Sequence, residues 1–259
     1  MPEITKYAPG TPSWVDLSSP DVEASVTFYS ALFGWSAETD PDPEAGGYTM
    51  LRLDDRAVAG LFPLQDENQP PAWSTYVTVD DADATAKAVE GAGGAVIAPP
   101  FDVLDSGRMA ILVDPTGAFF SIWQPKANIG AELVNEPVSL CWNELNTRDL
   151  DGAKAFYRKV FGWEGATDDN DGMTYTEWRL DGEGIGGMLE ISDQVPAEVP
   201  ASWLAYFAVD DTDATVAKAG ELGGSVVVPP TDIPPGRFAL LSDPHGAHFA
   251  VITLSDPPG

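Results

Sequence analysis

A long segment of this chain occurs twice. Residues 14–35 (WVDLSSPDVEASVTFYSALFGW) match residues 142–163 (WNELNTRDLDGAKAFYRKVFGW) without a gap at an offset of 128, and eight of the twenty-two positions are identical. Two further segments repeat in the same order: VDDADAT (79–85) as VDDTDAT (209–215), and GRMAILVDPTGAFF (107–120) as GRFALLSDPHGAHF (236–249). A period near 125 residues is too long for a solenoid repeat and is typical of a duplicated domain. We therefore expect two similar domains, each forming a similar cavity or interface.

The length and charge of the chain limit its class. With 259 residues, 44% of them hydrophobic, each half is long enough to bury a core of its own. The 41 acidic and 13 basic residues give a net charge of −28, which repels phosphate backbones and anionic lipids. We therefore expect neither a nucleic acid nor a membrane as partner, and we interpret the acidic residues as a solvated surface.

Cysteine usage indicates the compartment. The single cysteine, Cys141, excludes an intramolecular disulfide, and no apolar run near the N-terminus resembles a signal peptide. We therefore expect a cytoplasmic protein. Cys141 begins an expected strand beside Trp142 and is interpreted as a small core residue.

The local patterns predict strands and helices in a repeating order. A strand is expected at 14–18, followed by a helix capped by Ser19 and ended by Gly34, and then by strands at 48–53 and 57–64. The next part repeats this order: a strand at 73–80, a helix from Asp81 to Gly93 and Gly94, a strand at 95–98, and strands on both sides of the turn DPTG. Each half therefore holds two strand–helix–strand units.

The halves divide the chain into two predicted domains. The first comprises residues 1–124 and the second residues 139–259. Residues 125–138 connect them and are too long for a tight turn, so we expect this connector to run across the surface.

The combined motifs resemble the vicinal oxygen chelate superfamily, which includes glyoxalases, bleomycin resistance proteins and extradiol dioxygenases. The resemblance rests on a helix that ends in FYxxLFGW or FYxxVFGW and on a unit that closes with GRxAxLxDPxGAxF, and it covers both halves. It implies an α+β fold in which two βαβββ units lie edge to edge and their mixed sheet curls into a cup for a ligand. Four units imply two cups with helices outside, or one working cup and one that supports it.

The same resemblance implies where a metal ion would bind. Metal-dependent members use His or Glu from the first and last strands of their units, and a hard or borderline ion needs three or four such ligands. At the corresponding positions this chain has mostly residues that cannot bind a metal: Trp14, Trp142, Ser121, Ala250, Ser74, Leu204, Pro63 and Glu190. The two histidines, His245 and His248, lie three apart at a turn-to-strand junction. We therefore expect no cofactor, with a divalent metal as the less favoured alternative.

Strand periodicity indicates a different site. Asp16 lies two residues after Trp14, and Glu144 two after Trp142, so each carboxylate faces the same side of its strand as the tryptophan. A carboxylate beside an imidazole is suited to proton transfer next to a carbonyl. The predicted catalytic residues are Glu144, His248 and Asp16. The predicted ligand-binding residues are Trp14, Trp142, Phe119, Trp123, Arg108 and Arg237.

Each of these residues also has a structural interpretation. The tryptophans could be core residues that close the sheets, and the two carboxylates could cap backbone groups or pair with an arginine. Phe119 occupies in the first half the place of His248 in the second, so the first half does without that imidazole. Arg108 and Arg237 could hold the DPxG turn, or could grip a carboxylate or enolate.

Three functions remain open from the sequence. The first is a metal-independent lyase, isomerase or hydroxylase that acts on a small aromatic or carbonyl-bearing metabolite. The second is a protein that sequesters a drug or metabolite without turnover, and the third is a metal-dependent glyoxalase. Because each cup needs two units and the chain supplies four, a monomer is sufficient, and a homodimer is the alternative.

Overall fold

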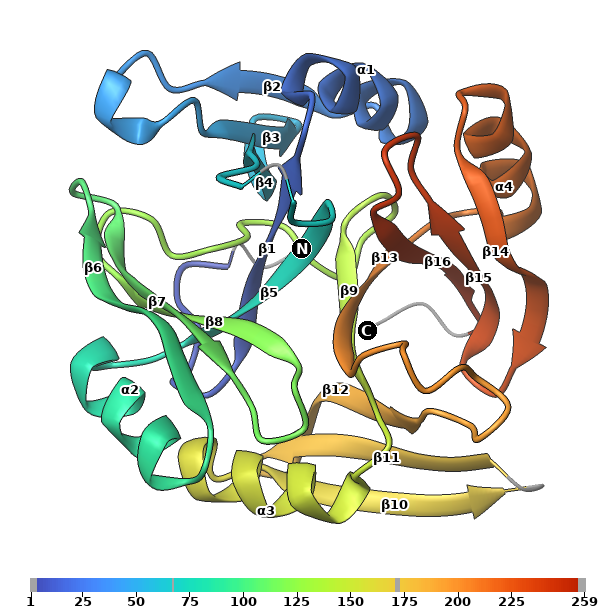
Figure 1. Cartoon of the computed structure of the whole chain (residues 1–259). Coiled ribbons are helices and arrows are strands. Elements are labelled where there is room, and N and C mark those ends of the chain that lie inside the picture. Colours follow the sequence, from blue (N-terminus) through green and yellow to red (C-terminus); the bar gives the residue numbers. More distant parts are fainter. Residues whose placement is uncertain (1–3, 67, 171–172, 256–259) are drawn as a thin grey trace.

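The computed structural model describes residues 4–66, 68–170 and 173–255, which form two mixed sheets of eight strands each (Figure 1). The first sheet contains β1 (Pro12–Ser19), β2 (Ser36–Thr39), β3 (Thr49–Leu53), β4 (Arg56–Pro63), β5 (Ala72–Thr78), β6 (Ala95–Val103), β7 (Gly107–Val113) and β8 (Phe119–Pro125). The second contains β9 (Leu140–Thr147), β10 (Glu164–Asn170), β11 (Met173–Leu180), β12 (Glu183–Glu190), β13 (Ser202–Ala208), β14 (Ser225–Ile233), β15 (Gly236–Ser242) and β16 (His248–Leu254). The helices are α1 (Val22–Phe33), α2 (Ala82–Gly91), α3 (Leu150–Phe161) and α4 (Thr212–Glu221), with a short 3-10 turn at Pro43–Ala45.

Both sheets have the same topology, which confirms the predicted α+β duplication. The strand order is β2-β3-β4-β1-β5-β8-β7-β6 in the first sheet and β10-β11-β12-β9-β13-β16-β15-β14 in the second. In each, the first strand pairs parallel with the last strand of its own unit and antiparallel with the first strand of the next unit. Two βαβββ units therefore join edge to edge, and the joined sheet curls with its helices outside (Figure 1).

Aspartate starts all four helices of the described chain. The side chain of Asp21 accepts a hydrogen bond from the backbone N–H of Ala24, and Asp81, Asp149 and Asp211 cap their helices in the same way. The prediction that Ser19 caps the first helix is therefore wrong. The Ser19 hydroxyl instead accepts from the backbone N–H of Asp21 and bonds to the Ser25 hydroxyl.

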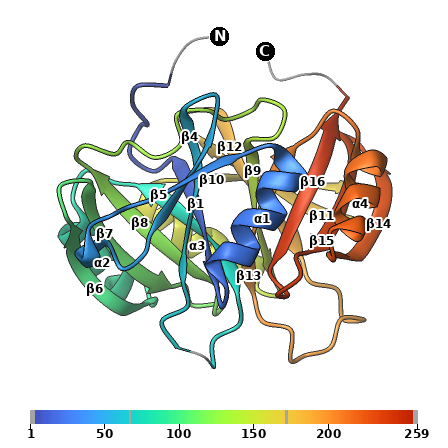
Figure 2. The same ribbon diagram turned by 90° about the horizontal axis from the view of Figure 1, so that it is seen from above.

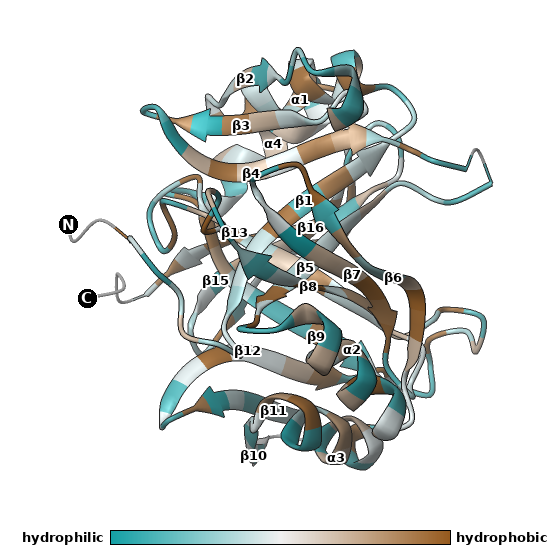
Figure 3. Cartoon of the chain, turned by 90° about the vertical axis from the view of Figure 1, so that its left-hand side faces the viewer, coloured by the Kyte–Doolittle hydropathy of each residue, from teal (hydrophilic) through white to brown (hydrophobic). Residues whose placement is uncertain are grey.

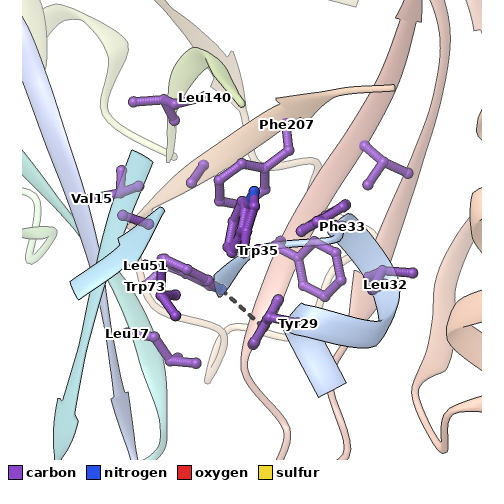
Figure 4. Close-up of a cluster of buried hydrophobic side chains, with 14 of the residues drawn as sticks. Val15, Leu17, Tyr29, Leu32, Phe33, Trp35, Leu51, Trp73, Leu140 and Phe207 are labelled. Atoms are coloured by element: carbon purple, nitrogen blue, oxygen red, sulfur yellow. Dashed lines mark hydrogen bonds between the residues drawn. The ribbon is translucent and has the colours of Figure 1, made fainter. Parts of the chain in front are cut away.

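The two halves share their hydrophobic cores. The outer face of the first unit, including Val15, Leu17 and Trp35, packs against residues of the fourth unit such as Phe207 (Figure 4). The second unit packs in the same way against the third, where Trp163 and neighbouring residues are buried. Each sheet therefore turns its convex face toward the other half, and the concave faces point away from these cores.

The repeated FY and DPxG motifs meet across this boundary. Trp73 Nε1 donates to the Tyr29 hydroxyl at 3.1 Å (Figure 4). That hydroxyl donates to Asp243 Oδ2 at 3.2 Å. The other half repeats the bonds with the partners Trp203, Tyr157 and Asp114, at 3.0 and 2.8 Å. The tyrosine of one half thus holds the DPxG aspartate of the other, and we call each of these three-residue chains a latch.

The connector does not simply run over the surface. Its backbone bonds to the first sheet, since the N–H of Ala131 donates to the carbonyl of Ser13 and the N–H of Glu132 to the carbonyl of Ala57. Ala131 is fully buried. Figure 2 shows the connector on the same side of the molecule as the β3–β4 turn, opposite residues 64–66 and 68–71 and the loop at 191–201.

The outer edges of the sheets carry exposed apolar residues. Edge strand β6 is apolar over most of its length, and its Ile97 and Phe101 are 54% and 44% exposed (Figure 3). Proline pairs at 99–100 and 229–230 interrupt β6 and β14, which limits strand addition at these edges. Within the described residues, no helix has the length and apolar character needed to cross a bilayer.

Candidate functional site

The concave face of the first sheet carries aromatic side chains around a buried carboxyl. We call cup A the group Trp14, Asp16, Tyr48, Tyr76 and Trp123. Trp14 and Asp16 lie on the same face of β1, whereas Val15 and Leu17 face the core, as the predicted strand alternation requires. The pairing of β1 with β5 sets Tyr76 opposite Trp14.

A chain of hydrogen bonds joins the side chains of cup A. The Tyr76 hydroxyl donates to Asp16 Oδ2 at 2.8 Å, and the Tyr48 hydroxyl donates to the same oxygen at 3.4 Å. Trp14 Nε1 in turn donates to the Tyr48 hydroxyl at 2.9 Å. Asp16 is 2% exposed, and its other oxygen, Oδ1, is buried without a hydrogen-bond partner in the described chain. The two oxygens of this carboxyl therefore differ, since the described hydrogen bonds all go to Oδ2.

Burial changes the acidity of this carboxyl. Loss of solvation raises the pKa of Asp16 from 3.8 to about 7, while the hydrogen bonds from Tyr76 and Tyr48 oppose the rise. The same desolvation and the nearby Asp16 charge raise the pKa of Tyr48 and Tyr76 well above the usual value, so both phenols stay protonated donors. Near neutral pH the carboxyl exists in both forms, which suits a group that takes and returns a proton.

The second sheet repeats the arrangement. We call cup B the group Trp142, Glu144, Tyr175, Tyr206 and Ile252. The Tyr206 hydroxyl donates to Glu144 Oε1 at 2.9 Å, and Trp142 Nε1 donates to the Tyr175 hydroxyl at 2.9 Å. Burial raises the pKa of Glu144 from 4.5 to about 7, and hydrogen bonds from Tyr206, Tyr175 and Asn146 oppose the rise.

The four tyrosines were missed from the sequence, although a signal exists. Tyr48 and Tyr175 both begin the pattern YTxxRL, and Tyr76 and Tyr206 both lie in the pattern YxxVD. The strand order brings these tyrosines from 32 and 60 residues away to Asp16, and from 62 residues away to Glu144. Position-by-position comparison of the two copies would have identified them as repeated polar groups on the concave face.

Among the described residues, the predicted histidine does not hydrogen-bond the carboxyl. His248 is exposed at the first residue of β16, and the hydrogen bonds that Glu144 accepts come from Tyr206, Tyr175 and Asn146. Phe119, its counterpart in the first half, is 59% exposed at the start of β8. Phe119 and His248 are the first residues of β8 and β16, where the side chains are exposed to solvent. A position on the predicted face of the strand is therefore not enough to bring either side chain to the carboxyl. Trp123 does lie in cup A, where it is 8% exposed.

Arg108 and Arg237 lie outside both cups. Arg108 forms ion pairs with Asp83 of α2 and with Asp102, and Arg237 pairs with Asp213 of α4 and with Asp232. The guanidinium groups thus hold the helices against the sheets and are satisfied there, and they lower the pKa of Asp83 and Asp213. Among the described residues neither guanidinium bonds to a DPxG turn, and the predicted grip on a ligand stays a prediction.

Comparison with known proteins identifies the family. A family model of the Glyoxalase/Bleomycin resistance protein/Dioxygenase superfamily matches residues 11–122 and 139–251. The chain belongs to this superfamily. Members of this superfamily bind small-molecule ligands.

Two relatives in this superfamily are similar over nearly their whole length. CFP32 of Mycobacterium tuberculosis (strain CDC 1551 / Oshkosh), whose glyoxylase assignment is provisional, is 46% identical over 258 residues, which cover 97% of this chain and 98% of the relative. Anthracycline biosynthesis protein DnrV of Streptomyces peucetius is 43% identical over 267 residues, which cover 98% of this chain and 96% of the relative.

Solved structures of the superfamily share the fold at low identity. The 2,3-dioxygenase LapB from Pseudomonas sp. KL28 aligns with a TM-score of 0.66 and 14% identity, covering 98% of this chain and 96% of LapB. The Mn(II)-bound glyoxalase from Novosphingobium aromaticivorans aligns with a TM-score of 0.65 and 16% identity, covering 96% of this chain and 86% of that protein.

The donor groups in the cups do not fit the divalent metal that some members of the superfamily use. Asp16 faces Gly60 across the β1–β4 pair, and Glu144 faces Gly187 across β9–β12, so the strand that would supply a second ligand supplies none. At Gly60 a Cβ would lie 1.9 Å from the Tyr48 hydroxyl, which fills this space. Glu190 lies exposed at the end of β12.

The described chain outside the cups also lacks a group of metal ligands. In residues 4–66, 68–170 and 173–255 no three His, Cys, Asp or Glu side chains come together in a metal-binding group. One carboxylate with phenols and an indole around it is a poor donor set for a divalent ion, which needs three or four ligands. We therefore derive the chemistry of each cup from its carboxyl and its tyrosines.

Proposed function

We propose that the protein binds a small metabolite that carries an aromatic ring and a carbonyl group, and that it transfers a proton at the carbon next to that carbonyl without a metal ion. The observation that carries this proposal is the buried carboxyl beside two tyrosine hydroxyls on an aromatic face. It occurs in both cups, with Asp16 in one and Glu144 in the other. Two relatives named for glyoxylase activity and for anthracycline biosynthesis support a carbonyl-bearing, aromatic substrate.

In each cup the carboxylate acts as the base and a tyrosine hydroxyl acts as the hydrogen-bond donor. In its ionised form the carboxylate takes the proton from the carbon, and the electron pair of the broken C–H bond forms the enolate. A tyrosine hydroxyl donates a hydrogen bond to the enolate oxygen, where negative charge develops. The carboxylic acid then returns the proton to the same carbon or to another position of the enolate. No net oxidation occurs, and the product is an isomer or a re-protonated substrate.

The two tyrosines of cup A are not equally bound to the carboxyl. The Tyr76 bond to Asp16 is short at 2.8 Å, whereas the Tyr48 bond is long at 3.4 Å. A hydrogen bond of this length is weak. Tyr76 therefore holds the carboxyl of cup A more firmly than Tyr48 does.

The test is exchange of the α-hydrogen with solvent. A panel of aromatic ketones is incubated with the protein in D2O, and deuterium uptake at the α-carbon is followed by NMR. The native protein is expected to accelerate uptake for at least one ketone. The double variant Asp16→Asn, Glu144→Gln is expected to lose about 100-fold or more of this rate, because a positioned base contributes at least that much. Each variant keeps an oxygen that can accept the tyrosine hydrogen bond.

Sequestration without turnover is the second candidate. Asp16 and Glu144 are 2% and 5% exposed, and such burial also suits a carboxyl that only anchors a ligand. Calorimetric titration with the same ketones separates the two functions. Binding without deuterium uptake above the buffer rate would overturn proton transfer and establish sequestration.

A further inference from the structure

We infer that cup B is the cup that a ligand enters, and that the connector keeps cup A closed. This inference rests on the proposed function, which it deepens by assigning that function to one of two similar sites. It is carried by differences between matched positions of the two halves.

The connector is fixed over the start of β1. The backbone N–H of Ala131 donates to the carbonyl of Ser13 at 2.8 Å, and the hydroxyl of Tyr7 donates to the carbonyl of Ala131 at 2.6 Å. Gly130 brings the connector so close that a Cβ there would lie 2.5 Å from the Ser13 carbonyl oxygen, and its φ of +106° also favours glycine. Ser13 itself is completely buried.

Glu132 ties the connector to a second strand. Its backbone N–H donates to the carbonyl of Ala57 at 2.8 Å, and its side-chain Oε2 accepts from the N–H of Ala57 at 2.7 Å. The start of β4 is thereby joined to the start of β1 through the connector. Two strands and the N-terminal segment hold the same short piece of chain, so its opening requires several bonds to break together.

The connector also completes the apolar cluster of cup A. Ala131 is 0% exposed and packs with Trp14, Tyr76 and Trp123, and Val134 packs against the same cluster. The ring of Trp123 lies over Gly107, where a Cβ would be 2.3 Å from it. Cup A is therefore filled by its own indoles and covered by the connector.

Cup B differs from cup A at three matched positions, whereas its carboxyl and Tyr206 are buried like Asp16 and Tyr76. Trp142 is partly exposed, whereas Trp14 is only 5% exposed. Cys141, the counterpart of Ser13, is also partly exposed, whereas Ser13 is 0% exposed. Ile252 stands where cup A has Trp123 and occupies less volume.

The side chains of cup B match the proposed ligand. Trp142, Tyr206 and Phe238 supply apolar faces, and the rings of Tyr206 and Phe238 have centroids 6.4 Å apart. Glu144 and Tyr175 lie beside them as the base and the donor. A ligand with an aromatic ring against these faces can place its carbonyl group at Tyr175 and its acidic carbon at Glu144.

The native cysteine reports on access to cup B. Cys141 is the only cysteine of the chain and packs against the cup B cluster. The variant Ser13→Cys, Cys141→Ser moves the single thiol to the matched position under the connector. The reaction of each thiol with 5,5′-dithiobis(2-nitrobenzoate) is followed at the same alkaline pH, because the thiolate is the form that reacts.

The expected result is a large difference in rate. Cys141 is expected to react about tenfold faster or more than the thiol introduced at Ser13, since a covered thiol reacts only when the connector opens locally. A smaller ratio overturns the inference. Addition of Tyr7→Phe and Glu132→Ala to the Ser13→Cys, Cys141→Ser variant is expected to raise its reaction rate, because both changes remove bonds that hold the connector.

Hydrogen exchange of the unmodified chain gives an independent measurement should the variants fail to fold. The backbone amides of Ala131 and Glu132 are expected to be strongly protected, and rapid exchange at both would overturn the closed state of cup A. Neither experiment depends on turnover. A failure of α-deuteration with a clear difference in thiol access would refute the proposed chemistry and leave the assignment of the open cup standing.

Discussion

Tyr76 donates its hydroxyl to Asp16 across 2.8 Å, and the second half of the chain reproduces this bond between Tyr206 and Glu144 at 2.9 Å. The acid has changed from Asp to Glu between the copies, yet the phenol still reaches it. The distance between phenol and carboxyl is thus the same in both cups although the side chain is one methylene longer.

Stability is expected to fall as the pH rises from about 4 to about 7. The unfolded chain releases the Asp16 proton near 3.8, whereas the native protein holds it until about 7, so the native state binds more protons in this range. The loss is up to about 1.4 kcal/mol per pH unit for each such carboxyl, and it stops once both states are ionised. Urea denaturation of Asp16→Asn should therefore show a shallower pH dependence than the native protein. Asp105→Asn, which removes an exposed carboxyl, should leave the slope unchanged.

Removal of the Tyr206 hydroxyl is expected to make Glu144 a weaker acid. Tyr206 lowers the pKa of Glu144 by bonding its charged form, so Tyr206→Phe should raise that pKa above about 7. The pH profile of α-deuteration should then shift to higher pH, and its maximum rate should fall. Tyr76→Phe is the matched control, since it changes Asp16 in the closed cup and should leave the profile in place. A profile unaffected by Tyr206→Phe would show that Glu144 is not the base.

A methyl group at Gly187 is expected to displace Tyr175. An added Cβ would lie 1.9 Å from the Tyr175 hydroxyl and 2.8 Å from Trp142 Nε1. Gly187→Ala should therefore reduce turnover and cost about 1–3 kcal/mol of unfolding free energy. Gly60→Ala meets Tyr48 in the same way and should cost similar stability while sparing turnover. Gly220→Ala, in open space on α4, should instead stabilise the protein.

Loss of the tyrosine hydroxyl from a latch is expected to lower the free energy of unfolding of the protein. Tyr157→Phe leaves Asp114 Oδ2 and Trp203 Nε1 without this partner in a buried place, at a cost of about 1–3 kcal/mol. Tyr29→Phe does the same to Asp243 and Trp73. Urea denaturation measures both. A change below about 0.5 kcal/mol in both variants would mean that water replaces the lost bonds.

Chelation is expected to leave the activity unchanged. The proposed chemistry uses a carboxyl and tyrosine hydroxyls, so the protein dialysed against EDTA should retain its rate of α-deuteration. Elemental analysis of the purified protein should find no stoichiometric divalent metal. Loss of the rate on chelation, with recovery on addition of one metal, would contradict this prediction.

The fold was predictable because the sequence contains two copies of the same domain. The repeated FY and DPxG motifs lie at the same places in both halves, and strand alternation correctly put Asp16 on the face of Trp14. The tyrosines were not predicted because local patterns do not contain the sheet order. That order brings Tyr48, just before β3, and Tyr76 of β5 to Asp16, and it repeats this for Tyr175 of β11 and Tyr206 of β13. The sequence did not indicate which face of its strand Arg108 occupies. In the structure its guanidinium lies toward α2, where it pairs with Asp83.

The connector shows a second limit of sequence reasoning. Its length excluded a tight turn, but nothing in its composition indicated that Ala131 would be buried. Burial there depends on Ser13, Ala57 and Tyr7, which lie far away in the sequence and are brought near only by the finished sheet. Contacts of this kind are a property of the assembled fold.

The cores shared between distant units have a consequence for how such a chain can change. Val15 and Phe207 occupy one apolar interior although they come from opposite halves of the sequence. After a duplication, one copy can usually accumulate substitutions without harm to the other. Here a core substitution in either half also changes the packing of the other half, because the two share one apolar core. Substitutions that alter the chemistry of one half are therefore tolerated best on its concave face, where the side chains pack within a single sheet.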